Sequence, residues 1–162
     1  MADNTSIMER LKGTSLPAWS DIPDLDLYMD QVLALMKRYL GPLSASGDKG
    51  ITSSMVNNYV KQGVMPAPKK KRYTKIHLVY LIMIYILKNA LTMTQIRSLI
   101  ESELSNQSLE DLYTAFCEQY RNTATEAASR YRDTVSDPLS ASTNAAIRAY
   151  IEQSVSASLI KQ

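Results

Sequence analysis

The chain has 162 residues and a formal net charge of +2; 45% of its residues are hydrophobic and 21% are charged, a composition typical of globular proteins rather than of disordered or collagen-like ones. Its five glycines and six prolines are too few for a glycine-rich β-sandwich, so the composition favours a mostly helical fold. Cys117 is the only cysteine, which excludes an intrachain disulfide and a cysteine-cluster metal site.

The N-terminal segment, residues 1–20, shows little periodicity and is expected to be a flexible lead-in. It contains no apolar segment of signal-peptide length. The longest apolar run of the chain, residues 78–87, is about half as long as a membrane span requires. We therefore expect a cytoplasmic protein that has no membrane partner.

The first two helices are predicted from capping signals and apolar spacing. A capping side chain and a proline at residues 20–23 predict a helix start, and Gly41-Pro42 predicts its end. A loop rich in serine and glycine follows, and a short second helix is predicted from near Ser53 to Gly63. The apolar stripe of the first helix comprises Leu25, Tyr28, Met29, Val32, Met36 and Leu40.

A lysine-rich segment separates the second helix from the third. Pro66 and Pro68 bias the residues before them toward extended backbone, and the basic run 69–72 comes next. This pattern predicts either a small β-hairpin with a basic tip or an open loop. A new helix is expected at Thr74, and because residues 76–87 are apolar on nearly all sides, it is predicted to be the buried central helix.

Three more helices are predicted in the C-terminal half. Thr92 and Gln95 have the spacing of a capping box, which opens a short helix. A similar signal near Ser108 opens a longer helix that Asp137-Pro138 ends. The last helix is amphipathic and presents Ile147, Tyr150, Ile151 and Val155. The chain is thus expected to be all-α.

Positive charge is concentrated in the middle of the chain. Between Lys49 and Ile100 nine residues are basic and none is acidic. The rest of the chain carries nine basic and all 16 acidic residues, a net charge of −7. A cationic segment inside an otherwise acidic chain indicates a specialised surface.

The second helix has a polar face of the kind that can read DNA. Ser54, Asn57, Asn58 and Lys61 lie at positions i, i+3, i+4 and i+7, so they share one face opposite Val56 and Tyr59. Asparagine can make a bidentate contact with adenine in the major groove, and serine and lysine can reach base edges or phosphates. The alternative interpretation is an ordinary solvated helix surface.

The basic run follows this helix within ten residues and comprises Lys69, Lys70, Lys71 and Arg72. Four cations on a projecting loop suit phosphates or a narrow minor groove, although a lysine run is often only a solvated loop. A polar helix face beside a basic wing is the arrangement of a winged helix-turn-helix protein.

Three segments resemble the MerR-type regulators. Residues 55–68 resemble the second helix and turn of that family, 73–78 resemble the end of its wing and the start of its third helix, and 90–96 resemble the segment leading to its fourth helix. Asn57 stands where these regulators usually carry an arginine that holds DNA, and Asn58 where they carry an aromatic residue. The usual wing arginine aligns with Lys71, and Arg72 lies beside it.

More closely, residues from about 19 to 100 resemble an uncharacterised bacterial family, the domain of unknown function eighteen-thirty-six, which has been placed near MerR by fold. The resemblance implies a winged helix-turn-helix core at 21–104 with a small basic wing. Residues 105–162 then form a C-terminal helical extension that serves packing or dimerisation.

Catalysis is not expected. The sequence has no Walker or dinucleotide-binding glycine loop and no metalloprotease or serine-hydrolase motif. His77 is the only histidine and has no second ligand at hand, so it is expected to be a partly buried helix residue and not a metal ligand. Cys117 is expected to be a packed thiol. No metal or cofactor is predicted.

Two functions from different classes remain. The first is a transcriptional regulator that binds double-stranded DNA as a homodimer formed through the C-terminal helices. The second is a helical protein–protein interaction module that uses a winged-helix scaffold without reading DNA sequence. A preference for one DNA sequence over random duplex would separate them.

Overall fold

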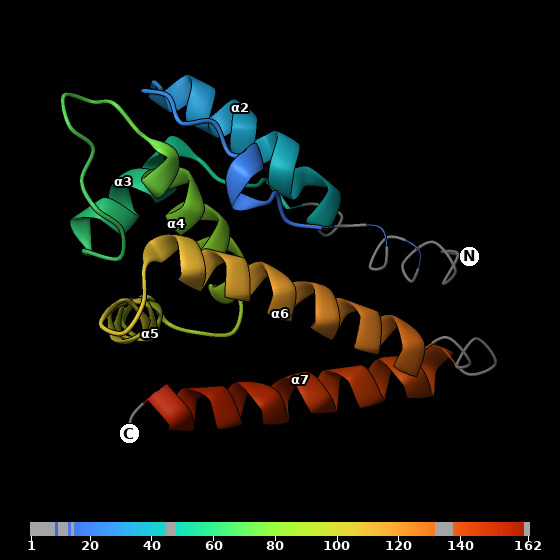
Figure 1. Ribbon diagram of the computed structural model, residues 1–162. Helices are drawn as coiled ribbons and strands as arrows, with labels where there is room; N and C mark the ends of the chain where they lie inside the picture. The colour runs from blue at the N-terminus through green and yellow to red at the C-terminus, as the bar shows by residue number, and fades with distance from the viewer. Residues whose placement is uncertain (1–8, 10–12, 14, 45–47, 132–137, 161–162) are drawn as a thin grey trace. The chain divides into compact units, whose positions relative to one another are not determined.

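The computed structural model describes residues 9, 13, 15–44, 48–131 and 138–160 (Figure 1). These residues contain α-helices, short 3₁₀ helices and no β-strand, which confirms the all-α prediction. The α-helices are α2 (Met29–Leu40), α3 (Ser53–Lys61), α4 (Lys75–Leu87), α5 (Met93–Leu104), α6 (Leu109–Arg130) and α7 (Pro138–Ile160). The 3₁₀ helices are η1 (Trp19–Asp21) and η2 (Gly41–Leu43). The chain divides into two compact units, Leu16–Cys117 and a second one that joins Met1–Ser15 to Glu118–Gln162.

Helix α4 is the centre of the Leu16–Cys117 unit. Its sequence is apolar all round, and Leu78, Leu81 and Ile82 are fully buried. Helix α2 packs on α4, and its buried residues are Val32, Met36 and Leu40. Each buried aliphatic side chain contributes about 1.5–3 kcal/mol relative to an exposed one. The prediction of a buried central helix is therefore confirmed.

Local capping signals give the observed starts of the next helices. The side chain of Thr92 accepts a hydrogen bond from the Gln95 N–H at 3.3 Å, and the Gln95 side chain accepts one from the Thr92 N–H at 2.9 Å. Ser108 accepts from the Asp111 N–H at 3.1 Å at the start of α6. The contacts are reciprocal at Thr92 and one-way at Ser108, and both satisfy N–H groups that have no partner inside the helix, so the predicted starts of α5 and α6 are confirmed.

The predicted start of the first helix at residues 20–23 is wrong. Trp19–Asp21 forms only the short η1, and α2 begins at Met29. The backbone between them is held extended by Leu27, which exchanges two hydrogen bonds with Tyr73, at 2.8 and 2.9 Å. A residue that pairs with another segment through its backbone cannot at the same time make helical hydrogen bonds, so the helix starts after it.

The segment before η1 is fixed by contacts within the same unit. Leu16 is buried, and the carbonyl of Pro17 accepts a hydrogen bond from the Tyr113 hydroxyl at 2.7 Å. Burial also raises the pKa of Tyr113 above its ordinary value. The Sγ atom of Cys117 lies 3.8 Å from the same carbonyl, as expected for a packed thiol.

The second unit contains the C-terminal part of α6 and the whole of α7. Ala124 and Ala128 are buried on α6. Helix α7 is different, because its large apolar side chains face solvent. They are Leu139, Ile147, Tyr150, Ile151, Val155 and Leu159.

Candidate nucleic-acid interface

Helix α3 is anchored by its apolar side and exposes its polar side. Val56 and Tyr59 are 0% and 4% exposed, and the Thr52 side chain caps the helix by accepting from the Met55 N–H at 3.3 Å. The opposite side is what we call the polar face of α3; it comprises Ser54, Asn57, Asn58 and Lys61, all of which are exposed. Because the buried residues fix the rotation of the helix, these four side chains are presented together to solvent.

The C-terminal end of α3 is closed by a left-handed glycine. Gly63 has φ +68°, and the N–H of Val64 donates to the Tyr59 carbonyl at 2.9 Å. Val64 and Met65 are then buried at 3% exposure each, so the chain turns sharply into the core. The predicted stop at Gly63 is confirmed.

Arg97 of α5 lies against this glycine. A Cβ atom added at Gly63 would come within 3.1 Å of Arg97 Nη1, so the absence of a side chain makes room for the guanidinium. Arg97 Nε also donates to Glu101 Oε1 at 2.7 Å, in a largely exposed pair. The sequence shows that Arg97 belongs to the acid-free segment. It does not predict that Arg97 contacts the end of α3, because this contact depends on how α5 packs.

The basic run forms a tight turn, which we call the basic turn (Lys69–Arg72). The Arg72 N–H donates to the Lys69 carbonyl at 2.8 Å, and the two residues form an isolated antiparallel bridge. The central residues, Lys70 and Lys71, have φ angles of +48° and +58°. Two successive positive φ angles are typical of the type I′ turns that connect hairpins. The basic tip is therefore a hairpin turn without flanking strands in the described chain.

Lysine is an unfavourable residue for those two positions. Type I′ turns prefer Asn-Gly because a Cβ atom in the left-handed region costs about 1–2 kcal/mol per residue. The turn is held by the neighbouring residue, since Tyr73 is hydrogen-bonded to Leu27 on both sides of its backbone. The surrounding contacts thus force two exposed lysines into a strained conformation, a feature that clusters at functional sites.

Aromatic rings fix the cations at the base of the turn. The Arg72 guanidinium lies 3.6 Å from the centre of the Tyr28 ring, and Lys75 Nζ lies 4.6 Å from the Trp19 ring. Arg72 is consequently half-buried, whereas Lys69, Lys70 and Lys71 are exposed. The four predicted phosphate ligands therefore fall into one anchored cation and three that face solvent.

His77 organises the start of α4 and is 6% exposed. Its Nδ1 atom accepts a hydrogen bond from the Thr74 N–H at 2.9 Å, so the histidine occupies the place that Glu or Gln takes in a capping box. Its Nε2 atom is buried without a partner of good hydrogen-bond geometry, although the Ala67 backbone is near enough to favour the charged ring. Burial outweighs that effect and lowers the pKa of His77.

His77 also lines a hollow beside the basic turn. The hollow has a volume of about 550 Å³ and is lined by Asp26, Pro66, Ala67, Lys69, Lys70, Arg72, Thr74, Ile76 and His77. No group of three His, Cys, Asp or Glu side chains that could hold a metal ion occurs within the described part of the chain.

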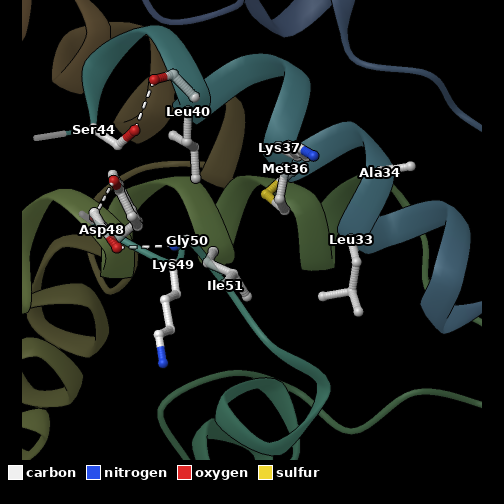
Figure 2. A pocket seen from close by; sticks show the side chains of 12 residues that line it. Leu33, Ala34, Met36, Lys37, Leu40, Ser44, Asp48, Lys49, Gly50 and Ile51 are labelled. Atoms are coloured by element: carbon white, nitrogen blue, oxygen red, sulfur yellow. Dashed lines mark hydrogen bonds between the residues drawn. The ribbon is translucent and has the colours of Figure 1, made fainter. Parts of the chain in front are cut away.

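A second cavity, of about 400 Å³, lies between α2 and the segment that leads into α3. Figure 2 shows Leu33 and Met36 of α2 on one side and Ile51 on the other. At its edge Asp48 accepts hydrogen bonds from the Tyr85 hydroxyl at 2.6 Å and from the Gly50 N–H at 2.8 Å (Figure 2). These two bonds, the first more than the second, lower the pKa of Asp48. They also tie the entrance of α3 to α4, which sequence spacing did not indicate.

Comparison with protein families matches residues 17–122, more than half of the chain, to "Domain of unknown function (DUF1836)". The chain belongs to this family. The match to DUF1836 includes α2 to α5 and the first part of α6, and so contains the polar face of α3 and the basic turn; α7 lies outside it. Comparisons with curated proteins and with solved structures gave no match. None of the helices in the described part of the chain is both long and apolar enough to cross a membrane.

Proposed function

We propose that this protein is a DNA-binding transcriptional regulator with a MerR-like winged helix-turn-helix core. In this proposal α3 enters the major groove of double-stranded DNA, and the basic turn contacts the phosphate backbone. The observation that carries the proposal is the pairing of two exposed features in one acid-free stretch: the polar face of α3 and a strained turn that presents Lys70 and Lys71.

The polar face has the chemistry needed to read bases. Asn57 and Asn58 lie on neighbouring positions of a helix whose other side is buried, so both amides reach outward from a rigid support. The Asn58 Oδ1 atom accepts from Gln62 Nε2 at 3.2 Å, which orients its amide nitrogen away from Gln62. An amide presented in this way can meet the N6 and N7 edge of adenine.

The basic turn supplies charge without sequence information. Its three exposed lysines suit phosphate contacts, which position a protein on the duplex and make its affinity depend on salt. Arg97 lies at the end of α3, where its charge is shared with Glu101 and only weakly reinforces that of the lysines. The proposal is one of binding, and no catalytic residue is assigned.

The proposal is tested by titrating the full chain against a pool of genomic duplex fragments in low and physiological salt, and then sequencing the retained fraction. We expect one enriched motif. Asn57→Ala or Asn58→Ala should lower the preference for this motif by about 1–3 kcal/mol, the usual worth of a bidentate base contact. Asn122→Ala, which changes an exposed asparagine of α6, is the matched control and should have no effect.

A second variant separates recognition of the base sequence from electrostatic attraction to the phosphates. Replacing Lys69, Lys70 and Lys71 by glutamine should weaken binding to all duplexes alike and reduce its dependence on salt. Binding that shows no motif and vanishes at physiological salt would overturn the proposal. That outcome would favour the alternative, a protein–protein interaction module on the same scaffold.

A further inference from the structure

The hollow beside the basic turn has the size of a small-molecule site. Its volume of about 550 Å³ falls within the range of about 300–1,000 Å³ that is usual for ligand pockets. All of its lining residues belong to the Leu16–Cys117 unit, so its walls come from a single compact part of the chain. Ligand pockets combine apolar surface with a few convergent polar groups, and the hollow contains both.

One part of the lining is uncharged. Pro66, Ala67 and Ile76 contribute apolar surface that is exposed to solvent, Ile76 at 45%. The His77 ring adds to this part, because burial lowers its pKa and the ring is therefore neutral near neutral pH. A ligand with an apolar body would cover this surface and remove it from water.

The rest of the lining is dominated by positive charge. Lys69, Lys70 and Arg72 line the hollow together with one acidic residue, Asp26. Within the part of the chain that the structure describes, none of these three cations forms a salt bridge with a carboxylate. Arg72 is also held in place, since its guanidinium lies 3.6 Å from the centre of the Tyr28 ring. Three cations without an acidic partner favour a ligand that brings a negative charge.

The cations are carried on a backbone that other contacts hold in place. The Arg72 N–H donates to the Lys69 carbonyl at 2.8 Å, which closes the basic turn. Tyr73, the next residue, exchanges two backbone hydrogen bonds with Leu27, at 2.8 and 2.9 Å. A ligand therefore does not have to order the turn before it binds, and a site that is already formed binds more tightly than one that must be ordered.

We propose that this hollow binds a small organic acid, with its carboxylate against the cations of the basic turn and its apolar body against Pro66, Ala67 and Ile76. Binding of the acid does not depend on whether α3 binds DNA. The acid would, however, occupy Lys69 and Lys70, which the proposed function assigns to phosphates. It would therefore compete with DNA, and this competition, unlike the binding itself, rests on the proposed function.

The first test titrates the full chain with three probes and follows its backbone amide signals by NMR. Naphthoate has an apolar body and a carboxylate, naphthamide has the same body without the charge, and inorganic phosphate has the charge without the body. We expect saturable binding of naphthoate, about tenfold tighter than that of either other probe, with the largest signal changes at residues 66–77. Naphthoate that does not bind, that binds no more tightly than the other two, or that changes signals elsewhere would overturn the proposal.

The basic turn offers a matched pair of variants. Lys70 lines the hollow and Lys71 does not, although both are exposed and both have a positive φ. Lys70→Gln should weaken the binding of naphthoate about three- to fivefold, the usual effect of losing one exposed ion pair, and Lys71→Gln should change it by less than about twofold. Equal effects of the two substitutions would mean that the lysines attract the anion only from a distance, which would overturn the assignment to the hollow.

A third variant fills the hollow without changing its charge. Ala67→Phe should abolish the binding of naphthoate, whereas Ala90→Phe, at an exposed alanine that does not line the hollow, should preserve it. Circular dichroism checks that both variants keep their helices. An Ala67→Phe chain that binds naphthoate as the natural chain does would place the ligand elsewhere and overturn the proposal.

Competition with DNA is measured separately, by titrating the chain with duplex in the absence and presence of saturating naphthoate. We expect naphthoate to raise the apparent Kd for duplex. A chain that binds naphthoate but no duplex would overturn the proposed function and leave the organic-acid site standing. Duplex binding that naphthoate does not change would overturn the competition alone.

Discussion

Helices α4 and α7 are both rich in apolar residues, yet their apolar side chains differ in exposure to solvent. Most side chains of α4 are buried, with Leu81 and Ile82 at 0% exposure, whereas on α7 Ile151 and Val155 are each 53% exposed. The apolar residues of α4 surround the whole helix. The difference teaches that apolar content alone does not define a core: α4 forms the buried centre of its unit, whereas the large apolar side chains of α7 are exposed.

The largest effect on stability is expected when a buried side chain of α4 is removed. Leu81→Ala should lower the free energy of unfolding by about 2–5 kcal/mol, because it deletes buried surface and leaves a cavity in a packed core. Chemical denaturation followed by circular dichroism measures this loss. A cost below about 1 kcal/mol would mean that α4 is not the core of its unit.

The next largest effect is expected at the basic turn, and it has the opposite sign. Replacing Lys70 by Asn and Lys71 by Gly should raise the free energy of unfolding by about 1–2 kcal/mol, since both new residues tolerate a positive φ. The same variant should bind DNA more weakly, because two exposed cations are lost. A variant that is no more stable than the natural chain would argue against strain in this turn.

A smaller effect is the dependence of the free energy of unfolding on pH. Burial lowers the pKa of His77 below its ordinary 6.5, so the unfolded chain binds this proton more readily than the folded one. The resulting stability is fully present above pH 6.5 and is lost as the pH falls from there toward the folded pKa. Denaturation midpoints at a series of pH values measure it, and His77 is the only histidine in the chain.

The matched variant for this measurement is His77→Gln. Glutamine keeps the acceptor that the Thr74 N–H requires, as Gln95 does for Thr92, but it does not titrate. The loss of stability between pH 7.5 and 5.5 should therefore be smaller in His77→Gln than in the natural chain. Equal losses in the two proteins would show that His77 is not the group responsible.

The smallest effect should come from α7. Ile151→Ala should change the unfolding free energy of the Leu16–Cys117 unit by no more than about 0.5 kcal/mol, the usual limit for an exposed position. Chemical denaturation followed by circular dichroism measures this change. A loss as large as that of Leu81→Ala would mean that α7 belongs to the core after all.

Elements whose signals are local were predictable from the sequence. Thr92 with Gln95 and Ser108 with Asp111 lie within one helical turn of each other, so the starts of α5 and α6 followed from spacing alone. The start of α2 did not, because it depends on Leu27 pairing with Tyr73, which is far away in the sequence. Local propensity cannot anticipate a contact of that kind.

In the candidate interface, too, some features follow from local sequence signals and others depend on distant contacts. The exposure of Asn57 and Asn58 followed from helical periodicity, and the structure confirms that exposure. The strained turn was not predictable, because Lys70 and Lys71 are unfavourable at positive φ and only the contacts around them impose it. The contact of Arg97 with Gly63 depends on the packing of α5, for which the sequence has no local signal.

The backbone exchange between Leu27 and Tyr73 also defines the smallest piece of this protein worth expressing. A fragment beginning at Met29 would retain every helix from α2 to α5, and judged by its helical content it would look complete. It would nevertheless lack Trp19, Leu27 and Tyr28, which hold Lys75, Tyr73 and Arg72 respectively. Such a fragment would keep its helices but lose the contacts that hold the basic turn in place. Any domain boundary used in the laboratory should therefore fall before Leu16.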